Sequence, residues 1–236
     1  IETFVHGAMC ISYSGRCLLS NYLSGRDANK GACSHPCRWK YYLMEETRPG
    51  EYMPVEENER GTYIFNSKDL CMLNHIPELI DAGISSLKIE GRMKTPYYVG
   101  TVVKAYRQAI DDYFKDPEYY KSRIDYYMSE ITKASHRDFT TGFYFGKPGH
   151  DDQVYTNNSY IRDYDFIGIV TEDRDDESGC AVIMQRNKFE VGDKIEILPV
   201  SGDSMEMTVT QMWNEEGISV QSAPHPEQIL KLKTDL

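Results

Sequence analysis

No run of apolar residues in this sequence approaches the roughly 18 that a membrane-spanning helix needs. The sequence also lacks the H-E-x-x-H pattern of zinc protease helices and the G-x-S-x-G turn of serine hydrolases. We therefore expect no membrane span and find no motif for peptide hydrolysis. The first residue is Ile1 instead of Met and it opens a strand-like run, so we expect the chain to be part of a longer protein.

Charged residues are distributed unevenly along the chain. Residues 1–150 contain 19 of each sign, whereas residues 151–236 carry the whole formal net charge of −11. Basic residues gather in two segments of the neutral part: Arg16, Arg26, Lys30, Arg38 and Lys40, then Lys88, Arg92, Lys94, Lys104 and Arg107. Local basic patches of this kind can meet RNA phosphates. The alternative is a solvated surface with charges at helix ends.

Strand-like and helical patterns alternate in the first part of the chain. Strands are expected at residues 2–6, 62–66 and 85–90. Helices are expected from a Ser67 cap to Gly83, from Thr95-Pro96 onward, and after Pro117. Such alternation implies a parallel sheet covered on both faces, and these strands are too few to close or protect one. We predict an α/β fold, the second half of an incomplete βα (TIM-like) barrel.

The second part of the chain has a different pattern. Short alternating runs separated by turn residues occur at 166–172, 180–186, 194–198, 205–213, 218–222 and 229–233. They predict a small all-β barrel domain. The expected organisation is a βα-barrel portion with the cysteines at 1–138, a linker at 139–165 and the β domain at 166–236.

Four of the six cysteines lie within the first 37 residues, spaced C-x6-C-x15-C-x3-C: Cys10, Cys17, Cys33 and Cys37. Four thiolates at varied spacings, with glycines beside them, suit an iron–sulfur cluster. A structural zinc site prefers two tight pairs, and only Cys33 and Cys37 resemble one. Free or disulfide-bonded cysteines are the third alternative. Cys71 and Cys180 stand alone and are expected to be core or near-core residues.

Several longer stretches form a recognisable pattern. They are E-x-F-x-H-G-A-M-C-I-S-Y-S-G-R-C at residues 2–17, G-x-C-x-x-P-C-R-W at 31–39, N-S-K-D-L at 66–70, S-L-K-I-E-G-R at 86–92 and Y-Y-V at 97–99. Together they closely resemble the signature of peptidase family U32, over about residues 1–115. The tail, with V-G-D at 191–193 and A-P-H-P at 223–226, resembles the C-terminal β-barrel domain of that family, which is similar to domain two of translation elongation factors.

The resemblance implies more than the family label of peptidase. Several U32 proteins are oxygen-independent hydroxylation factors that carry a [4Fe–4S] cluster, with prephenate implicated as the source of the hydroxyl group. Cys33/Cys37 and the run at 66–69 look most like the branch that hydroxylates wobble uridine of tRNA. The resemblance thus implies a cytoplasmic enzyme with tRNA as partner and Cys10, Cys17, Cys33 and Cys37 as cluster ligands. It also implies a further partner, the N-terminal barrel half of the same protein.

Three other residues are candidates for catalytic roles. Glu90 and Arg92 follow an expected strand at the end where barrel enzymes carry their chemistry. There Glu90 could anchor a substrate hydroxyl and Arg92 could hold a carboxylate or phosphate; a structural ion pair is the alternative. His6 also ends a strand, as a hydrogen-bonding neighbour of the cluster or as a core histidine. Tyr13, Trp39 and Tyr41 could stack on RNA bases or pack around the cluster.

Two alternative functions remain open from the sequence. A thiol peptidase would need an activated cysteine with a histidine partner, for which Cys10 and His6 are available. A non-catalytic RNA-binding module would fit the translation-factor-like β domain by itself.

Overall fold

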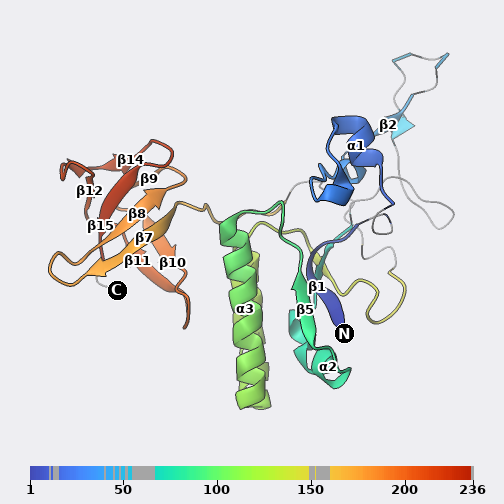
Figure 1. The fold of residues 1–236 in the computed structure, drawn as a ribbon, viewed down its shortest axis with the longest axis horizontal. Helices are drawn as coiled ribbons and strands as arrows, with labels where there is room; N and C mark the ends of the chain where they lie inside the picture. The colour runs from blue at the N-terminus through green and yellow to red at the C-terminus, as the bar shows by residue number, and fades with distance from the viewer. Residues whose placement is uncertain are drawn as a thin grey trace. The chain divides into compact units, whose positions relative to one another are not determined.

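The computed structural model describes residues 1–10, 12, 16–39, 41–44, 46–47, 49–50, 53–54, 67–148, 152 and 160–234. The chain divides into two compact units, Ile1–Arg162 and Asp163–Leu236. Figure 1 traces both units from the N-terminus to the C-terminus. The strand expected at 62–66 lies outside the described residues. No helix in the described ranges has both the length and the apolar character needed to cross a membrane.

The first unit is built on a mixed four-stranded sheet in the order β5-β1-β4-β6. Strand β1 (Glu2–Ala8) runs parallel to β5 (Ser86–Ile89) and antiparallel to β4 (Asp69–Cys71). Strand β6 (Phe139–Thr140) lies parallel to β4. Its residues belong to the segment 139–165, which the sequence predicted to be a linker. The result is a mixed α/β unit, and its described strands do not close into a barrel.

The prediction of a helix that begins at Ser67 is wrong. Residues Asp69–Cys71 are strand, and a helix begins only at α2 (Ile76–Asp81), after the short 3-10 turn η3 (Leu73–His75). All three β4 residues are buried, and Cys71 pairs with His6 of β1. Sheet pairing and burial of Leu70 therefore outweigh the local capping signal. Pro77 lies in the first turn of α2, where proline is tolerated, instead of kinking a longer helix.

Three helices share one apolar core with the sheet. The longest is α3 (Pro96–Lys115), followed by α4 (Pro117–Ser122) and α5 (Ile124–Thr132). The Thr95 side chain accepts a hydrogen bond from the Tyr98 N–H and Pro96 takes the first helical position, as the sequence predicted. Tyr106 of α3 ties helix to sheet: its buried hydroxyl donates to the Val5 carbonyl (2.8 Å) and accepts from the Met72 N–H (3.0 Å).

Shorter elements complete the first unit. They are α1 (Leu19–Ser24), the 3-10 turns η1 (Ala28–Lys30) and η2 (Pro36–Arg38), and the paired strands β2 (Tyr42–Leu43) and β3 (Met53–Pro54). Helix α1 packs against η2.

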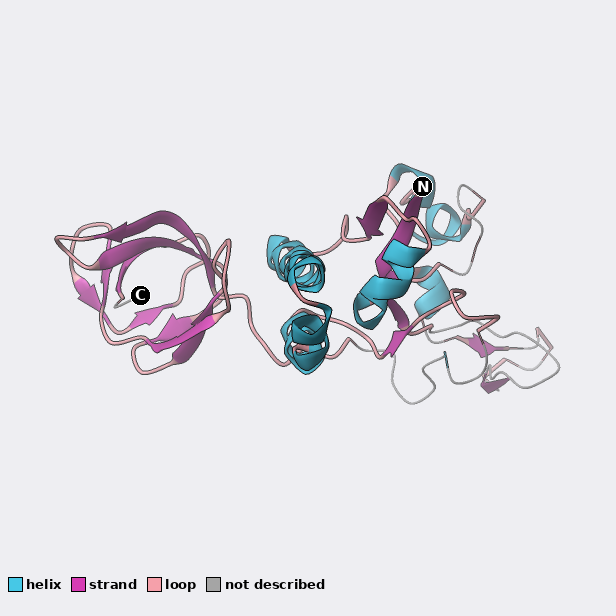
Figure 2. Cartoon of the chain, turned by 90° about the horizontal axis from the view of Figure 1, so that it is seen from below, coloured by secondary structure: helices cyan, strands magenta, loops and turns pink. Residues whose placement is uncertain are grey.

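The second unit contains only antiparallel strand pairs around one apolar core (Figure 2). Its strands are β7 (Gly168–Asp175), β8 (Cys180–Gln185), β9 (Phe189–Glu190), β10 (Lys194–Ile197), β11 (Met205–Thr208), β12 (Met212–Asn214), β13 (Ser219–Val220), β14 (Ser222–Ala223) and β15 (Ile229–Lys233). Five of them form the sheet β13-β12-β15-β8-β7, and β10-β11 and β14-β9 form two separate pairs. The expected all-β domain is confirmed, without one closed sheet among its described strands.

The parallel strands β1 and β5 lie close together at their carboxyl ends. The Glu90 N–H donates to the His6 carbonyl (2.9 Å), and Gly7 follows with a φ of 115°. A Cβ at Gly7 would lie 2.6 Å from the Glu90 carbonyl oxygen and 2.9 Å from its Cβ. Only glycine allows both this φ and this distance.

Gly7→Ala should therefore destabilise the protein strongly, because the backbone at Glu90 cannot rotate away as a side chain could. We expect the free energy of unfolding to fall by about 3 kcal/mol, from backbone strain plus overpacking. Gly25→Ala is the matched control, since Gly25 also has a positive φ (67°) but no atom lies within 4 Å of its added Cβ. That variant should lose only about 1 kcal/mol. Equal losses in urea unfolding would contradict the close contact.

Candidate functional site

Three of the four clustered cysteines lie in one small lobe, residues 16–39, which we call the cysteine lobe. The Ser34 N–H donates to the Ser20 hydroxyl (2.9 Å), and the hydroxyls of Ser20 and Ser24 both contact the Ser34 hydroxyl. These bonds join α1, just after Cys17, to the segment that contains Cys33. Polar contacts within the lobe therefore bring the segments that carry Cys17 and Cys33 together, although these cysteines are far apart in the sequence.

The cysteine lobe is attached to the chain that leaves β5. The Arg92 Nη1 donates to the Lys30 carbonyl (3.2 Å), and the Arg26 guanidinium reaches the Met93 sulfur (3.9 Å). Gly31 has a φ of 76°, and a Cβ there would lie 1.6 Å from Arg92 Nη1. The guanidinium thus lies directly on the backbone of Gly31, two residues before Cys33.

None of the six cysteines, all of which lie in the described ranges, forms a disulfide bond. Cys10 is exposed and Cys17, Cys33 and Cys37 are half-buried. The sulfur of Cys10 accepts from the Ser12 N–H (3.4 Å) and that of Cys33 from the His35 N–H (3.3 Å). Backbone N–H groups aimed at sulfur are typical surroundings of cluster-bound thiolates.

The structure does not itself assemble a metal cage. Within the described ranges, no group of three or more His, Cys, Asp or Glu side chains is arranged to hold a metal ion. The four thiols nevertheless fit a thiolate-ligated group by their chemistry, because they are accessible and two already accept backbone N–H donors. Cys71 differs: burial raises the pKa of its thiol to about 11. Cys180 lies in the other unit, on β8.

Glu90 and Arg92 are exposed at the end of β5, as a site at the strand ends requires. The Glu90 carboxylate accepts a hydrogen bond from the backbone N–H of Arg92 (3.1 Å). This contact forms a local turn and is not an ion pair between the two side chains. The structure brings Arg92 to the cysteine lobe.

His6 lies in the core beneath this edge. Its ring is 2% exposed and packs against Tyr98, Tyr106 and Phe139, with centroids 5.6–6.1 Å away. Burial, assisted by the charges of Lys94 and His136, lowers the pKa of His6 to about 3. The imidazole is therefore neutral near pH 7.

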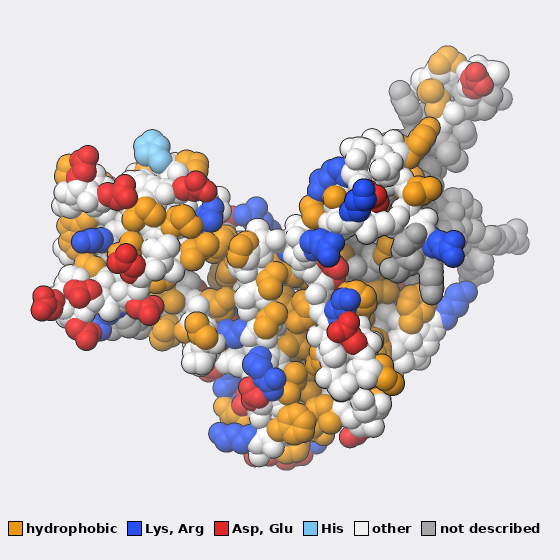
Figure 3. All heavy atoms as spheres, viewed as in Figure 1, with side chains coloured by type: hydrophobic (Ala, Val, Ile, Leu, Met, Phe, Trp, Pro, Cys, Tyr) orange, Lys and Arg blue, Asp and Glu red, His pale blue; other side chains and the backbone are white. Residues whose placement is uncertain are grey.

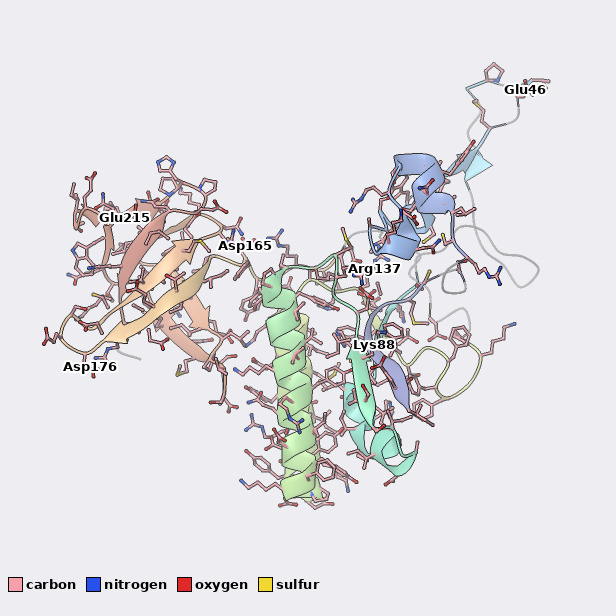
Figure 4. The ribbon with its side chains drawn as sticks, viewed as in Figure 1. Glu46, Lys88, Arg137, Asp165, Asp176 and Glu215 are labelled. Carbon is pink, nitrogen blue, oxygen red and sulfur yellow. The ribbon has the colours of Figure 1, made fainter. Side chains whose placement is uncertain are left out.

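Sequence reasoning missed a polar cluster next to His6. The Lys94 ammonium donates to the Ser135 carbonyl (3.2 Å) and lies over the Tyr160 ring (3.7 Å), which the Arg137 guanidinium also faces (4.7 Å; Figure 4). The backbone N–H of Arg137 reaches buried Asp69 (3.3 Å). These residues are spread over more than 90 positions of the sequence, so only the fold brings them together.

Most of the basic segment at 88–107 is committed to contacts within the first unit. Lys88, labelled on β5 in Figure 4, pairs with Glu2 (3.5 Å) and lies over the Phe4 ring (4.9 Å). Arg107 forms an ion pair with Asp111 on α3. Arg92 and Lys94 make the contacts described above. Arg16, Arg26 and Lys30 of the cysteine lobe are exposed, and the Lys30 ammonium lies 3.9 Å from the Asp27 carboxylate.

Comparison with known proteins identifies the class. Residues 1–154 match the model of peptidase family U32, and residues 162–236 match the model of its C-terminal domain. The chain belongs to this family.

Among its curated relatives is tRNA hydroxylation protein P1 of Bacillus subtilis, 40% identical over 100% of this chain and 55% of the relative. Another is tRNA hydroxylation protein P of Escherichia coli, 36% identical over 95% of this chain and 57% of the relative. A collagenase of Porphyromonas gingivalis is 35% identical over 62% of this chain and 34% of its own length. The chain thus spans about half the length of the curated relatives it matches.

Among solved structures, the chain is similar to the C-terminal domain of a U32 peptidase from Geobacillus thermoleovorans. The two are 33% identical, with a TM-score of 0.29, over 31% of this chain and 88% of the other.

The neutral, buried His6 should make stability depend on pH. In the unfolded chain this imidazole binds a proton below about pH 6.5, but the folded protein excludes it until about pH 3. Stability should be complete above pH 6.5 and fall as the pH drops, by about 2 kcal/mol at pH 5. His6→Phe should remove this part of the dependence. Parallel slopes for both proteins in urea unfolding between pH 5 and 8 would show that His6 contributes none of it.

Proposed function

We propose that this chain is the cysteine-bearing half of an enzyme that hydroxylates wobble uridine in tRNA, forming 5-hydroxyuridine. In this proposal Cys10, Cys17, Cys33 and Cys37 hold a [4Fe–4S] cluster. The observation that carries it is the anchoring of the cysteine lobe at the strand edge, through Arg92 on the Lys30 carbonyl. The similarity to tRNA hydroxylation proteins over nearly the whole chain supports the choice of substrate.

The roles of the remaining residues follow from their contacts. A bound cluster would supply electron-transfer chemistry. Arg92 donates one N–H to the Lys30 carbonyl. Because a guanidinium has five N–H donors, the other four could bind a carboxylate-bearing oxygen donor such as prephenate. Glu90, exposed at the same strand end, can accept a hydrogen bond from a substrate hydroxyl. Both residues would bind and orient small molecules next to the cysteine lobe.

The full-length protein is part of the proposal. The sheet order leaves β5 and β6 as edges among the described strands, and the relatives are nearly twice as long as this chain. We propose that the N-terminal half of the same protein supplies further βα units, which complete a barrel of which this chain is the second half. The assembled enzyme would act in the cytoplasm, where tRNA is modified.

The contacts of His6 disfavour a peptidase of the cysteine–histidine type. A general base must be reachable and able to take a proton near neutral pH. His6 is 2% exposed and its pKa is lowered to about 3 by burial. A peptidase built on Cys10 and His6 would need a different arrangement of the core.

The cluster can be tested directly on full-length protein purified without oxygen. We expect brown protein containing about four iron and four sulfide per chain. A serine at Cys10, Cys17, Cys33 or Cys37 should reduce the visible absorbance, because each removes a thiolate ligand. Cys71→Ser and Cys180→Ser are the matched controls and should leave iron content unchanged. Colourless protein with one zinc per chain would instead assign the four thiols to a structural zinc site.

The substrate can be tested by mass spectrometry of tRNA from cells that lack the protein and carry full-length variants. Wobble 5-hydroxyuridine should vanish on deletion and return with the wild type. Arg92→Ala should lower it at least about tenfold with iron content retained, as for a residue that orients a small reactant. Loss of iron and of tRNA binding together would instead make Arg92 only an anchor of the cysteine lobe. Lys88→Ala is the control, since the Lys88 side chain pairs with Glu2, which lies opposite Ser86 at the start of β5. Unchanged 5-hydroxyuridine after deletion, with no redundant pathway, would reject the tRNA assignment.

A further inference from the structure

An exposed tryptophan adjoins the proposed cluster ligands. Trp39 follows η2, two residues after Cys37, and is 45% exposed. Its ring lies nearly parallel to that of Tyr41, with an interplanar angle of 25° and centroids 6.5 Å apart. The Tyr41 hydroxyl donates to the Pro36 carbonyl (2.8 Å), which fixes this ring against η2. Trp39 is thus a large aromatic surface supported by a half-buried neighbour.

The surroundings of Trp39 combine aromatic and cationic side chains. Tyr22 on α1 is 86% exposed, and α1 packs against η2 within the same lobe. Exposed Arg16, Arg26 and Lys30 belong to this lobe too. Its acidic residue, Asp27, lies 3.9 Å from the Lys30 ammonium, which stays 83% exposed. Figure 3 shows Lys and Arg side chains gathered over the part of the first unit that contains α1.

This combination selects a class of ligand. Aromatic rings stack on bases and cations contact phosphates in proteins that bind single-stranded nucleic acid. In a duplex the base faces are already stacked on one another, so an indole can stack only on an unpaired base. Positive charge with one acidic residue favours a polyanion over a peptide. The surface therefore fits an unpaired RNA loop.

We propose that Trp39 is a stacking platform for an unpaired base of the RNA substrate, with Tyr22 as a second aromatic contact on the cysteine lobe. The inference rests on the proposed function, and it names the surface that receives the RNA. Because Trp39 lies two residues from Cys37, a base stacked there is brought to the edge that carries the cysteines. Trp39 is a positioning residue, whereas Arg16, Arg26 and Lys30 supply affinity for phosphates.

The test measures binding of a labelled tRNA anticodon hairpin to the full-length protein by fluorescence anisotropy. Trp39→Ala should weaken binding about tenfold at every salt concentration, from the loss of one stacked base. Trp39→Phe should restore most of the affinity, because phenylalanine retains a ring. Phe114→Ala, at the far end of α3 and 69% exposed in the wild type, should bind normally. Lys30→Ala should instead reduce the salt slope by a little under one unit.

Each other outcome is decisive. A fully paired RNA of equal length should not distinguish Trp39→Ala from the wild type, and equal weakening on this duplex would overturn stacking on an unpaired base. So would unchanged hairpin binding by Trp39→Ala, or loss of iron from this variant together with loss of binding, which would make Trp39 a packing residue. Trp39-dependent binding of a collagen peptide in place of RNA would also reject the proposal. If Trp39-dependent hairpin binding persists but deletion leaves 5-hydroxyuridine intact, the proposed function fails and the RNA surface stands.

Discussion

The contact of Gly7 with the Glu90 backbone is the constraint on which the candidate site depends. The missing side chain at Gly7 lets the carboxyl ends of β1 and β5 lie together, and the hydrogen bond from the Glu90 N–H to the His6 carbonyl joins them. The two segments that leave these strands therefore start side by side. One leads to Cys10 and the cysteine lobe, and the other carries Arg92. A side chain at Gly7 would separate the strands and, with them, the two parts of the site.

The cysteine lobe is held by polar contacts more than by a core. Of its described residues, only Ser20 and Pro36 are buried, and its links to the rest of the unit are made by Arg92 and Arg26. A segment with so little apolar burial gains little from the hydrophobic effect. Four metal–thiolate bonds would supply the missing cross-links, so cluster binding and the order of this lobe should be coupled. In the proposed function, the four cysteines would thus have a structural role in addition to their role as cluster ligands.

Net charge differs between the two parts of the chain. The second unit and the segment before it carry the whole net charge of −11, which repels phosphate. In the first unit, Lys88 and Arg107 are paired with carboxylates and Lys94 lies over aromatic rings. In our proposal, the exposed cations of the cysteine lobe meet RNA beside Trp39.

The sequence by itself determined the α3 helix, the all-β second unit and the family, because these depend on local capping, periodicity and contiguous motifs. It also singled out the four cysteines, whose spacing left cluster, zinc and free thiols open. Only the tertiary structure decided that Asp69–Cys71 is a strand, since pairing with β1 outweighs the capping signal at Ser67. It alone put Arg92 on Gly31 and buried His6 among three aromatic rings. Contacts between residues far apart in sequence have no local signal, because they arise from packing that no single segment encodes.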